Sequence, residues 1–190
     1  MSRLTSVAAI VAGFVALAAM RATTPHFIDI TGPIGFRGVP DKPVRTDNLV
    51  VTAGQPRLAR AIRFRAAGKV VTRDTGGVWL IVPVASQVDH KTTAVYGRTW
   101  LTQDGRRYAA SERVEGADAV LTSTKTIQPG LVRHDLLVFE VHPDVTAGGT
   151  LLLSEQRFPQ LTAEARIPFP KTPPAAPVAM LDLDDLHAKL

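Results

Sequence analysis

The 190-residue chain contains no cysteine. It can therefore form no disulfide bond, thiolate zinc site, cysteine nucleophile or acylated lipoprotein cysteine. Aromatic residues make up only 6% of the chain, and neither a glycine-rich phosphate loop nor a Gly-x-Ser-x-Gly motif occurs. These absences remove the commonest sequence signatures of redox, nucleotide and hydrolase sites.

Lysine is scarce as well: the chain has 16 Arg but only six Lys. This usage, together with abundant Ala, is typical of a high-GC genome. The 22 basic and 17 acidic side chains leave a net charge of +5, which favours acidic surfaces without indicating nucleic acid. With 45% apolar residues, the chain can bury one proper core, so we expect one folded domain.

Charge is absent from the N-terminal stretch Leu4 to Met20, "LTSVAAIVAGFVALAAM". As a helix, this stretch would span about 25 Å at about 1.5 Å per residue. That length suits a short membrane anchor and also the apolar region of a long signal peptide. The stretch is therefore an export or anchoring segment.

Hydrophobicity continues to the end of this stretch and Arg21 follows directly, which favours an uncleaved anchor. We expect residues 1–22 to cross the cell membrane once, with Arg3 cytoplasmic and the C-terminal domain extracytoplasmic. The alternative is a secreted protein, because Ala16-Leu17-Ala18 offers a small-x-small cleavage site.

After a Thr-, Pro- and Gly-rich linker over residues 23–43, short strand-like runs alternate with turn residues. The pattern predicts an all-β antiparallel sandwich over residues 44–170, preceded by the one hydrophobic helix. The expected strands are 45–53, 58–64, 78–86, 94–103, 106–112, 119–126, 135–142, 150–157 and 164–169. In "DLLVFEVH", the alternation predicts that Asp135, Leu137, Phe139 and Val141 face the core.

The most polar stretch within this region is "TQDGRRYAASER", residues 102–113. Asp104-Gly105 separates two strand-like runs, and Asp-Gly is favoured where both central residues of a tight hairpin need positive φ. An acid/base role would need a second carboxylate or a histidine beside Asp104, and the nearest one in the sequence is Glu112, eight residues away. We therefore interpret the stretch as a hairpin tip.

The succession "TGGVWLIVPV", "RTWLTQDGRRYAASER", "QPGLVRHDLLVFEVHPDV" and "LLLSEQRF" resembles an actinobacterial family of exported immunoglobulin-like domains of unknown function. It is also similar to small secreted mycobacterial antigens. The resemblance covers roughly residues 45–170 and implies an exported or membrane-tethered sandwich. It implies no activity and no functional residues.

The sequence offers only weak evidence for catalytic or metal-binding groups. His134, Glu140 and His142 share one face of a predicted strand, but no third ligand is evident beside Glu140 and His142. Asp89-His90 lies in a polar loop without a nucleophile elbow. We expect no enzymatic activity, no cofactor and no metal site.

A basic run without acids extends from Pro56 to Arg73 and contains Arg57, Arg60, Arg63, Arg65, Lys69 and Arg73. One interpretation is a patch that contacts anionic lipid head groups or acidic envelope polymers. The other is a solvated edge strand whose like charges discourage aggregation. Few aromatic residues accompany these arginines, so we do not expect nucleic acid as a partner.

The tail over residues 171–190 begins with a Pro-rich spacer and then changes period. Its apolar residues Met180, Leu183, Leu186 and Leu190 recur at helical spacing, which predicts a short amphipathic helix. Such a helix could fold back on the basic domain, dock into a partner's groove, or remain a disordered terminus.

Two functions fit this organisation. The first is a tethered binding or scaffolding module, accessory to an envelope or membrane transport assembly, with a membrane protein or envelope component as partner. The second is a secreted or periplasmic carrier of a small apolar or lipid-like ligand, which needs an apolar pocket of about 300 Å³ or more. The residues that would line or fill such a pocket are Trp79, Trp100, Tyr96, Phe139 and Phe158. We expect a filled core; the partner's identity and the oligomeric state stay open.

Overall fold

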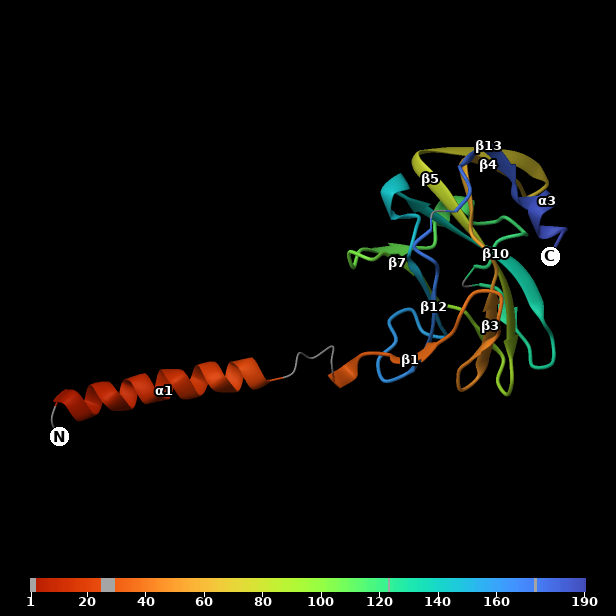
Figure 1. Cartoon of the computed structure of the whole chain (residues 1–190). Coiled ribbons are helices and arrows are strands. Elements are labelled where there is room, and N and C mark those ends of the chain that lie inside the picture. The colour runs from red at the N-terminus through yellow and green to blue at the C-terminus, as the bar shows by residue number, and fades with distance from the viewer. Residues whose placement is uncertain (1–2, 25–29, 123, 173) are drawn as a thin grey trace. The chain divides into compact units, whose positions relative to one another are not determined.

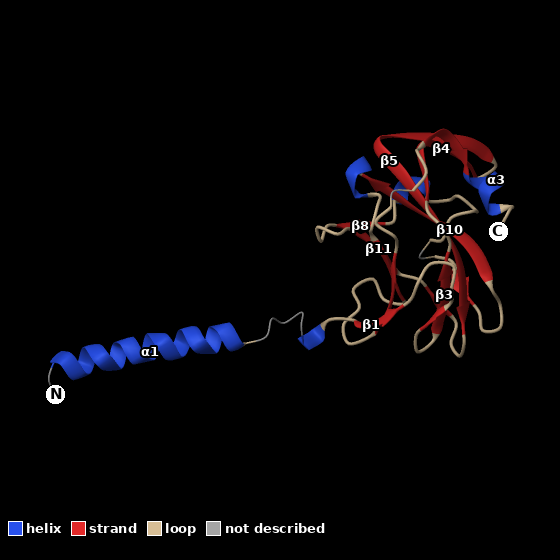
Figure 2. Cartoon of the chain, in the orientation of Figure 1, coloured by secondary structure: helices blue, strands red, loops and turns tan. Residues whose placement is uncertain are grey.

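The computed structural model describes residues 3–24, 30–122, 124–172 and 174–190. Residues 3 and 4 are described by their backbone only. The chain divides into two compact units, Met1–Gly32 and Pro33–Leu190. The first unit carries helix α1 (Arg3–Thr23), and the second consists mainly of strands (Figures 1 and 2). The predicted all-β sandwich preceded by one apolar helix is thus confirmed.

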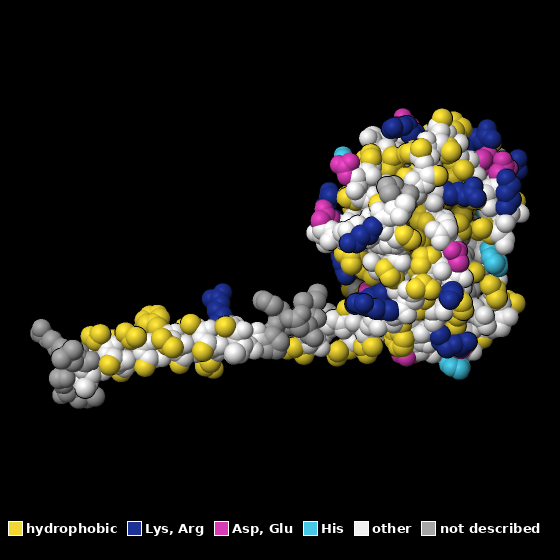
Figure 3. Space-filling model, viewed as in Figure 1, with side chains coloured by type: hydrophobic (Ala, Val, Ile, Leu, Met, Phe, Trp, Pro, Cys, Tyr) yellow, Lys and Arg dark blue, Asp and Glu magenta, His cyan; other side chains and the backbone are white. Residues whose placement is uncertain are grey.

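Helix α1 forms because its sequence is rich in Ala and aliphatic residues and contains no proline. The span Thr5–Thr23 is long and apolar enough to cross a membrane, and none of it is buried against the rest of the chain. Figure 3 shows apolar side chains along the helix. Phe14, for example, is 70% exposed. A helix with apolar side chains on all sides is typical of a membrane span or a signal sequence.

The second unit contains two main sheets. The smaller has five strands in the order β1 (Ile34–Arg37), β12 (Ala163–Pro168), β11 (Thr150–Ser154), β7 (Gly97–Leu101) and β8 (Arg107–Ala109). The larger has the path β13 (Val178–Asp182), β4 (Arg57–Ala66), β5 (Lys69–Val88), β3 (Leu49–Ala53) and β2 (Val44–Arg45), with β10 (Arg133–Val141) also paired to β5. Most pairs are antiparallel, but β1–β12 and β13–β4 are parallel.

The remaining elements are short. Strands β6 (Thr93–Ala94) and β9 (Thr126–Ile127) form a two-stranded ladder, η1 (Glu112–Val114) and η2 (Pro143–Val145) are single 3₁₀ turns, and α3 (Leu183–His187) follows β13.

The sandwich core fills the space between the two sheets. Trp100 of the smaller sheet and Phe139 of the larger are both fully buried there, with ring centroids 6.3 Å apart. A second apolar cluster covers the other face of the larger sheet, where Trp79, Leu136 and Val138 pack under η1, the residues that follow it, and α3. The larger sheet is therefore buried on both faces over Val78–Val82 of β5 and Leu136–Phe139 of β10, which explains why these two stretches are continuously apolar.

Because of this second cluster, both faces of β10 are buried, whereas the sequence predicted burial of one face only. Leu137, Phe139 and Val141 face the sandwich core as predicted. Leu136 and Val138, on the opposite face, are equally buried. Asp135 is also buried, at 1% exposure, and its carboxylate pairs with Lys125 and Arg133 at 3.2 and 3.1 Å.

Three sequence-based boundaries differ from the structure. The predicted linker over 23–43 contains β1, which is stabilised by pairing with β12 rather than by its own short sequence. The predicted strand over 119–126 is mostly loop in its described residues: Ala119 and Val120 pack in the second cluster, Leu121 packs in the sandwich core, and an isolated bridge joins Val120 to Leu136. The tail over 171–190 contains β13 before its helix, and β13 pairs in parallel with β4.

Candidate functional site

The structure divides the predicted basic run between two faces of the β4–β5 hairpin. Arg63 and Arg65 alternate with the buried Ile62 and Phe64, whereas Arg73 lies opposite Ile62 in the ladder and shares its face. Arg60 falls in the bulge between Ala59 and Ala61. All six basic residues of the run are exposed: Arg57, Arg60, Arg63, Arg65, Lys69 and Arg73. They do not form one patch.

Acids of the tail lie against part of the run. Arg63 forms an ion pair with Asp182 at 2.8 Å, and the backbone N–H of Arg65 donates to the Asp184 carboxylate at 2.9 Å. The carboxylate of Asp182 also accepts hydrogen bonds from the N–H groups of Asp184 and Asp185 and so caps α3. Burial alone would raise the pKa of Asp182, but the Arg63 bond and these two N–H groups outweigh it, so the pKa is lowered.

The tail therefore folds back onto the sandwich. Leu183 and Leu186 are 0% and 5% exposed within the second apolar cluster, so neither side chain is available to a partner. Met180 and Leu190 stay about half exposed, at 50% and 43%. The stripe predicted from Met180, Leu183, Leu186 and Leu190 is thus divided, because Leu183 and Leu186 pack in the second apolar cluster whereas Met180 lies on β13, before the helix begins at Leu183.

The hairpin tip lies where the sequence predicts it, but its turn is not of the predicted type. Only Gly105 has positive φ, at 83°, and not both central residues. The Thr102 N–H donates to the Arg106 carbonyl at 2.9 Å, and the Gly105 N–H donates to the Thr102 carbonyl at 3.1 Å. The hydrogen bond from Arg106 and that from the Thr102 hydroxyl lower the pKa of Asp104 to about 2. Asp104 is thus engaged in holding the turn.

The His134, Glu140 and His142 set is not assembled. Glu140 accepts hydrogen bonds from Arg113 at 2.9 Å and from the Thr75 hydroxyl at 2.5 Å. The Nδ1 atom of His142 lies 3.2 Å from the Asp144 carboxylate. Within the part of the chain that the structure describes, no group of three His, Asp or Glu side chains could hold a metal ion.

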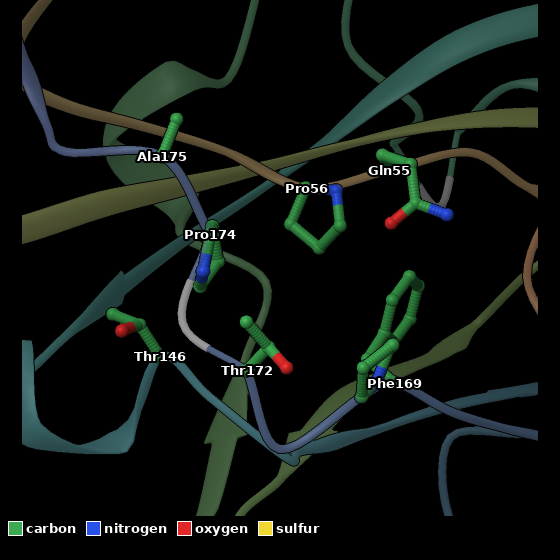
Figure 4. A pocket seen from close by; sticks show the side chains of 8 residues that line it. Gln55, Pro56, Thr146, Phe169, Thr172, Pro174 and Ala175 are labelled. Carbon is green, nitrogen blue, oxygen red and sulfur yellow. The ribbon is translucent and has the colours of Figure 1, made fainter.

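The aromatic residues mostly fill the core. Trp79, Trp100 and Phe139 are fully buried, whereas Tyr96 and Phe158 are 46% and 80% exposed and line no space between the sheets. A mainly apolar pocket of about 360 Å³ lies instead at the surface, between the β3–β4 connection and the Pro-rich segment (Figure 4). Its lining residues are Gln55, Pro56, Thr146, Phe169, Pro170, Thr172, Pro174 and Ala175.

A second hollow, a groove of about 330 Å³, lies on the face of the five-stranded sheet that points away from the core. We call it the arginine groove; its lining residues are Arg37, Leu101, Arg107, Thr150, Leu152, Glu164, Arg166 and Pro168. The register explains why they share one face. Arg37 lies opposite Arg166, and Leu101 lies opposite both Thr150 and Arg107.

Arg166 is held in place within this groove. Its Nε donates to the carboxylate of Glu164, which is only 3% exposed, at 2.8 Å. Its Nη2 donates to the Pro33 carbonyl at 3.4 Å. The side chain lies across Gly35, where a Cβ atom would meet Nε at 2.7 Å.

No pattern in the sequence predicts this groove. Arg37 fell in the expected linker, Arg107 was interpreted as part of the hairpin tip, and Glu164 with Arg166 is an ordinary polar pair on the outer face of a strand. The strand order that joins β1 to β12 and β8 to β7 is a tertiary property, and no sequence pattern indicates it.

No family model matches the chain, and no curated protein matches its sequence. Among solved structures, the chain is similar to an uncharacterised β-sandwich protein from Clostridium difficile, with a TM-score of 0.48 and 11% sequence identity. The match covers 76% of this chain and 99% of that chain.

Proposed function

We propose that this chain is a single-pass membrane protein whose immunoglobulin-like sandwich acts outside the cytoplasm as a binding or scaffolding module. The observation that carries the proposal is helix α1, whose apolar side chains are exposed along the whole span Thr5–Thr23 while the sandwich has a filled core of its own. Exposing so large an apolar surface to water is unfavourable, whereas a bilayer buries it.

The sandwich supports a binding role more than a chemical one. Several of its charged side chains are committed to structural pairs, such as Asp135 with Arg133 and Glu140 with Arg113. Its largest aromatic side chains are fully buried and fill the core, so a ligand or partner would bind at the surface of the sandwich. The partner is an envelope component or a membrane protein of the same bilayer.

Fractionation tests the tether. We expect the intact chain to sediment with membranes after a high-salt or alkaline wash and to require detergent for release. Mass spectrometry of the purified protein should find the α1 sequence. A mature chain that is soluble in the medium or periplasm and begins after Ala18 would replace the anchor with a cleaved signal peptide.

The second candidate function, a carrier of a small apolar ligand, is favoured by the surface pocket between the β3–β4 connection and the Pro-rich segment, because its volume of about 360 Å³ suits a small ligand. Native mass spectrometry of the detergent-purified protein should detect a co-purifying apolar molecule if this candidate is right. Substituting Pro56 by Asp in the pocket wall should then remove that molecule.

A further inference from the structure

We infer that the arginine groove binds the phosphate head groups of anionic lipids in the membrane that holds α1. This inference rests on the proposed membrane tether and adds the ligand class and the surface that contacts it. Three features of the second unit carry it: the uncompensated charge of the groove, the fixed position of Arg166, and the apolar loop beside β1.

The groove has an excess of positive charge. Three arginines line it against a single acid, Glu164, which is already paired with Arg166. Within the described residues, neither Arg37 nor Arg107 has an acidic partner at ion-pair distance. Arg37 is the register partner of Arg166, whose charge Glu164 offsets, so an anion bound beside them would offset the charge of Arg37. Guanidinium groups bind phosphate oxygens in a bidentate manner, so a phosphate suits this position.

Arg166 is arranged for binding before any ligand arrives. The buried Glu164 carboxylate and the Pro33 carbonyl hold two of its nitrogens. Gly35 provides the space in which its side chain lies flat across β1. A side chain held in this way loses little conformational entropy on binding, which strengthens binding without a new contact.

Chain connectivity limits the distance between the end of α1 and the groove. Helix α1 ends at Thr23 and β1 begins at Ile34, so ten residues, 24–33, join them. Fully extended, this connection spans at most about 40 Å. Arg37 follows Ile34 by three residues, and β1 is an edge strand of the five-stranded sheet. The groove therefore samples the head groups at a high effective concentration.

An exposed apolar loop distinguishes a lipid surface from a soluble phosphate. The β11–β12 loop presents Phe158 at 80% exposure and Leu161 at 63%, the latter with a φ of 50°. This loop lies beside the start of β1, since the Ile34 N–H donates to the Thr162 carbonyl at 2.9 Å. Apolar side chains next to basic groups are typical of surfaces that bind the membrane interface. A soluble anion would leave Phe158 and Leu161 in water.

The absence of cysteine makes a direct test possible. In the full chain, Ala109→Cys places one fluorescent label on the outer face of β8, two residues from Arg107. The labelled protein is reconstituted in nanodiscs that carry a quencher on the lipid head groups. The discs contain phosphatidylcholine alone or phosphatidylcholine with phosphatidylglycerol. We expect quenching of the label to rise in the anionic discs.

Matched variants locate the effect. Arg37→Gln with Arg107→Gln should lower the ratio of docked to undocked sandwich by about thirty-fold, because each basic group near an anionic surface contributes about 1 kcal/mol. Arg60→Gln with Arg73→Gln removes the same charge from the β4–β5 hairpin and should leave the quenching unchanged. Equal quenching in both lipids, or an equal loss in both double variants, overturns the inference.

Two further outcomes separate the possible failures. A chain that stays with the nanodisc but shows no anion-dependent quenching keeps the tether and overturns the groove. A chain that does not stay with the nanodisc overturns both. Soluble glycerol phosphate is added to the neutral discs as a third arm; a change in label emission without lipid quenching would assign the groove to soluble phosphate esters instead.

Discussion

Arg166 lies across Gly35. A Cβ atom at residue 35 would approach the Nε, Cζ and Cδ atoms of Arg166 to 2.7, 2.8 and 2.9 Å. The two residues belong to β1 and β12, which are far apart in the sequence and adjacent in the five-stranded sheet. Because Gly35 has no side chain, the Arg166 side chain can occupy this position in the arginine groove.

Gly35→Ala should move Arg166 out of this position with little loss of stability, because the end of an arginine side chain can shift. We expect the free energy of unfolding to change by less than about 1 kcal/mol, since losing a glycine also reduces the entropy of the unfolded chain. Quenching of the Ala109→Cys label in anionic nanodiscs should fall. Gly76→Ala, at a position with open space around its Cβ, is the control and should dock normally.

Gly105→Val should destabilise the sandwich by about 1–3 kcal/mol, because a β-branched residue is strained at the positive φ of this turn. Asp104→Asn should change little, because Asn tolerates the same turn. Urea unfolding of each variant measures the difference. Gly76→Val, at a position without positive φ, serves as the control. If Asp104→Asn stays folded but loses partner capture, the turn has a functional role as well.

Acid should loosen the tail. The folded-state pKa of Asp182 is lowered, so its charged form stabilises the folded protein above the pKa of the unfolded chain, about 3.9, and this contribution is lost as pH falls below that value. Hydrogen exchange of the amides of residues 178–187, corrected for the intrinsic rate, should show protection falling below about pH 4. Asp182→Asn keeps a helix cap but cannot titrate. Its protection should be lower at neutral pH and flat across this range; the same acid dependence in both proteins would contradict the assignment.

Leu183→Ala should destabilise the protein by about 2–5 kcal/mol, because this side chain is fully buried in the second apolar cluster. Met180→Ala, at a half-exposed position on β13, should cost less than about 0.5 kcal/mol. Thermal or urea unfolding of the two variants gives the comparison. A silent Leu183→Ala would mean that the tail is detached in solution and free to meet a partner.

The sequence by itself determined the helix, the β class and the central strands. An uncharged run from Leu4 to Met20 can form little other than an apolar helix. The continuous apolar run around Trp79 and the alternation along β10 are local patterns, and each is visible within about ten residues of sequence. The Asp104-Gly105 turn was predictable in place for the same reason, although its φ values depended on how the flanking strands paired.

Only the tertiary structure decided the edge strands of the two sheets and the arginine groove. Strand β1 exists because β12 lies beside it, and β13 exists because β4 does; neither short segment would be stable alone. The tail acids meet Arg63 and Arg65 across more than a hundred residues of sequence. The arginine groove likewise draws on β1, β7, β8, β11 and β12, whose order in the sheet is set by non-local pairing and by burial of the core, which no local pattern records.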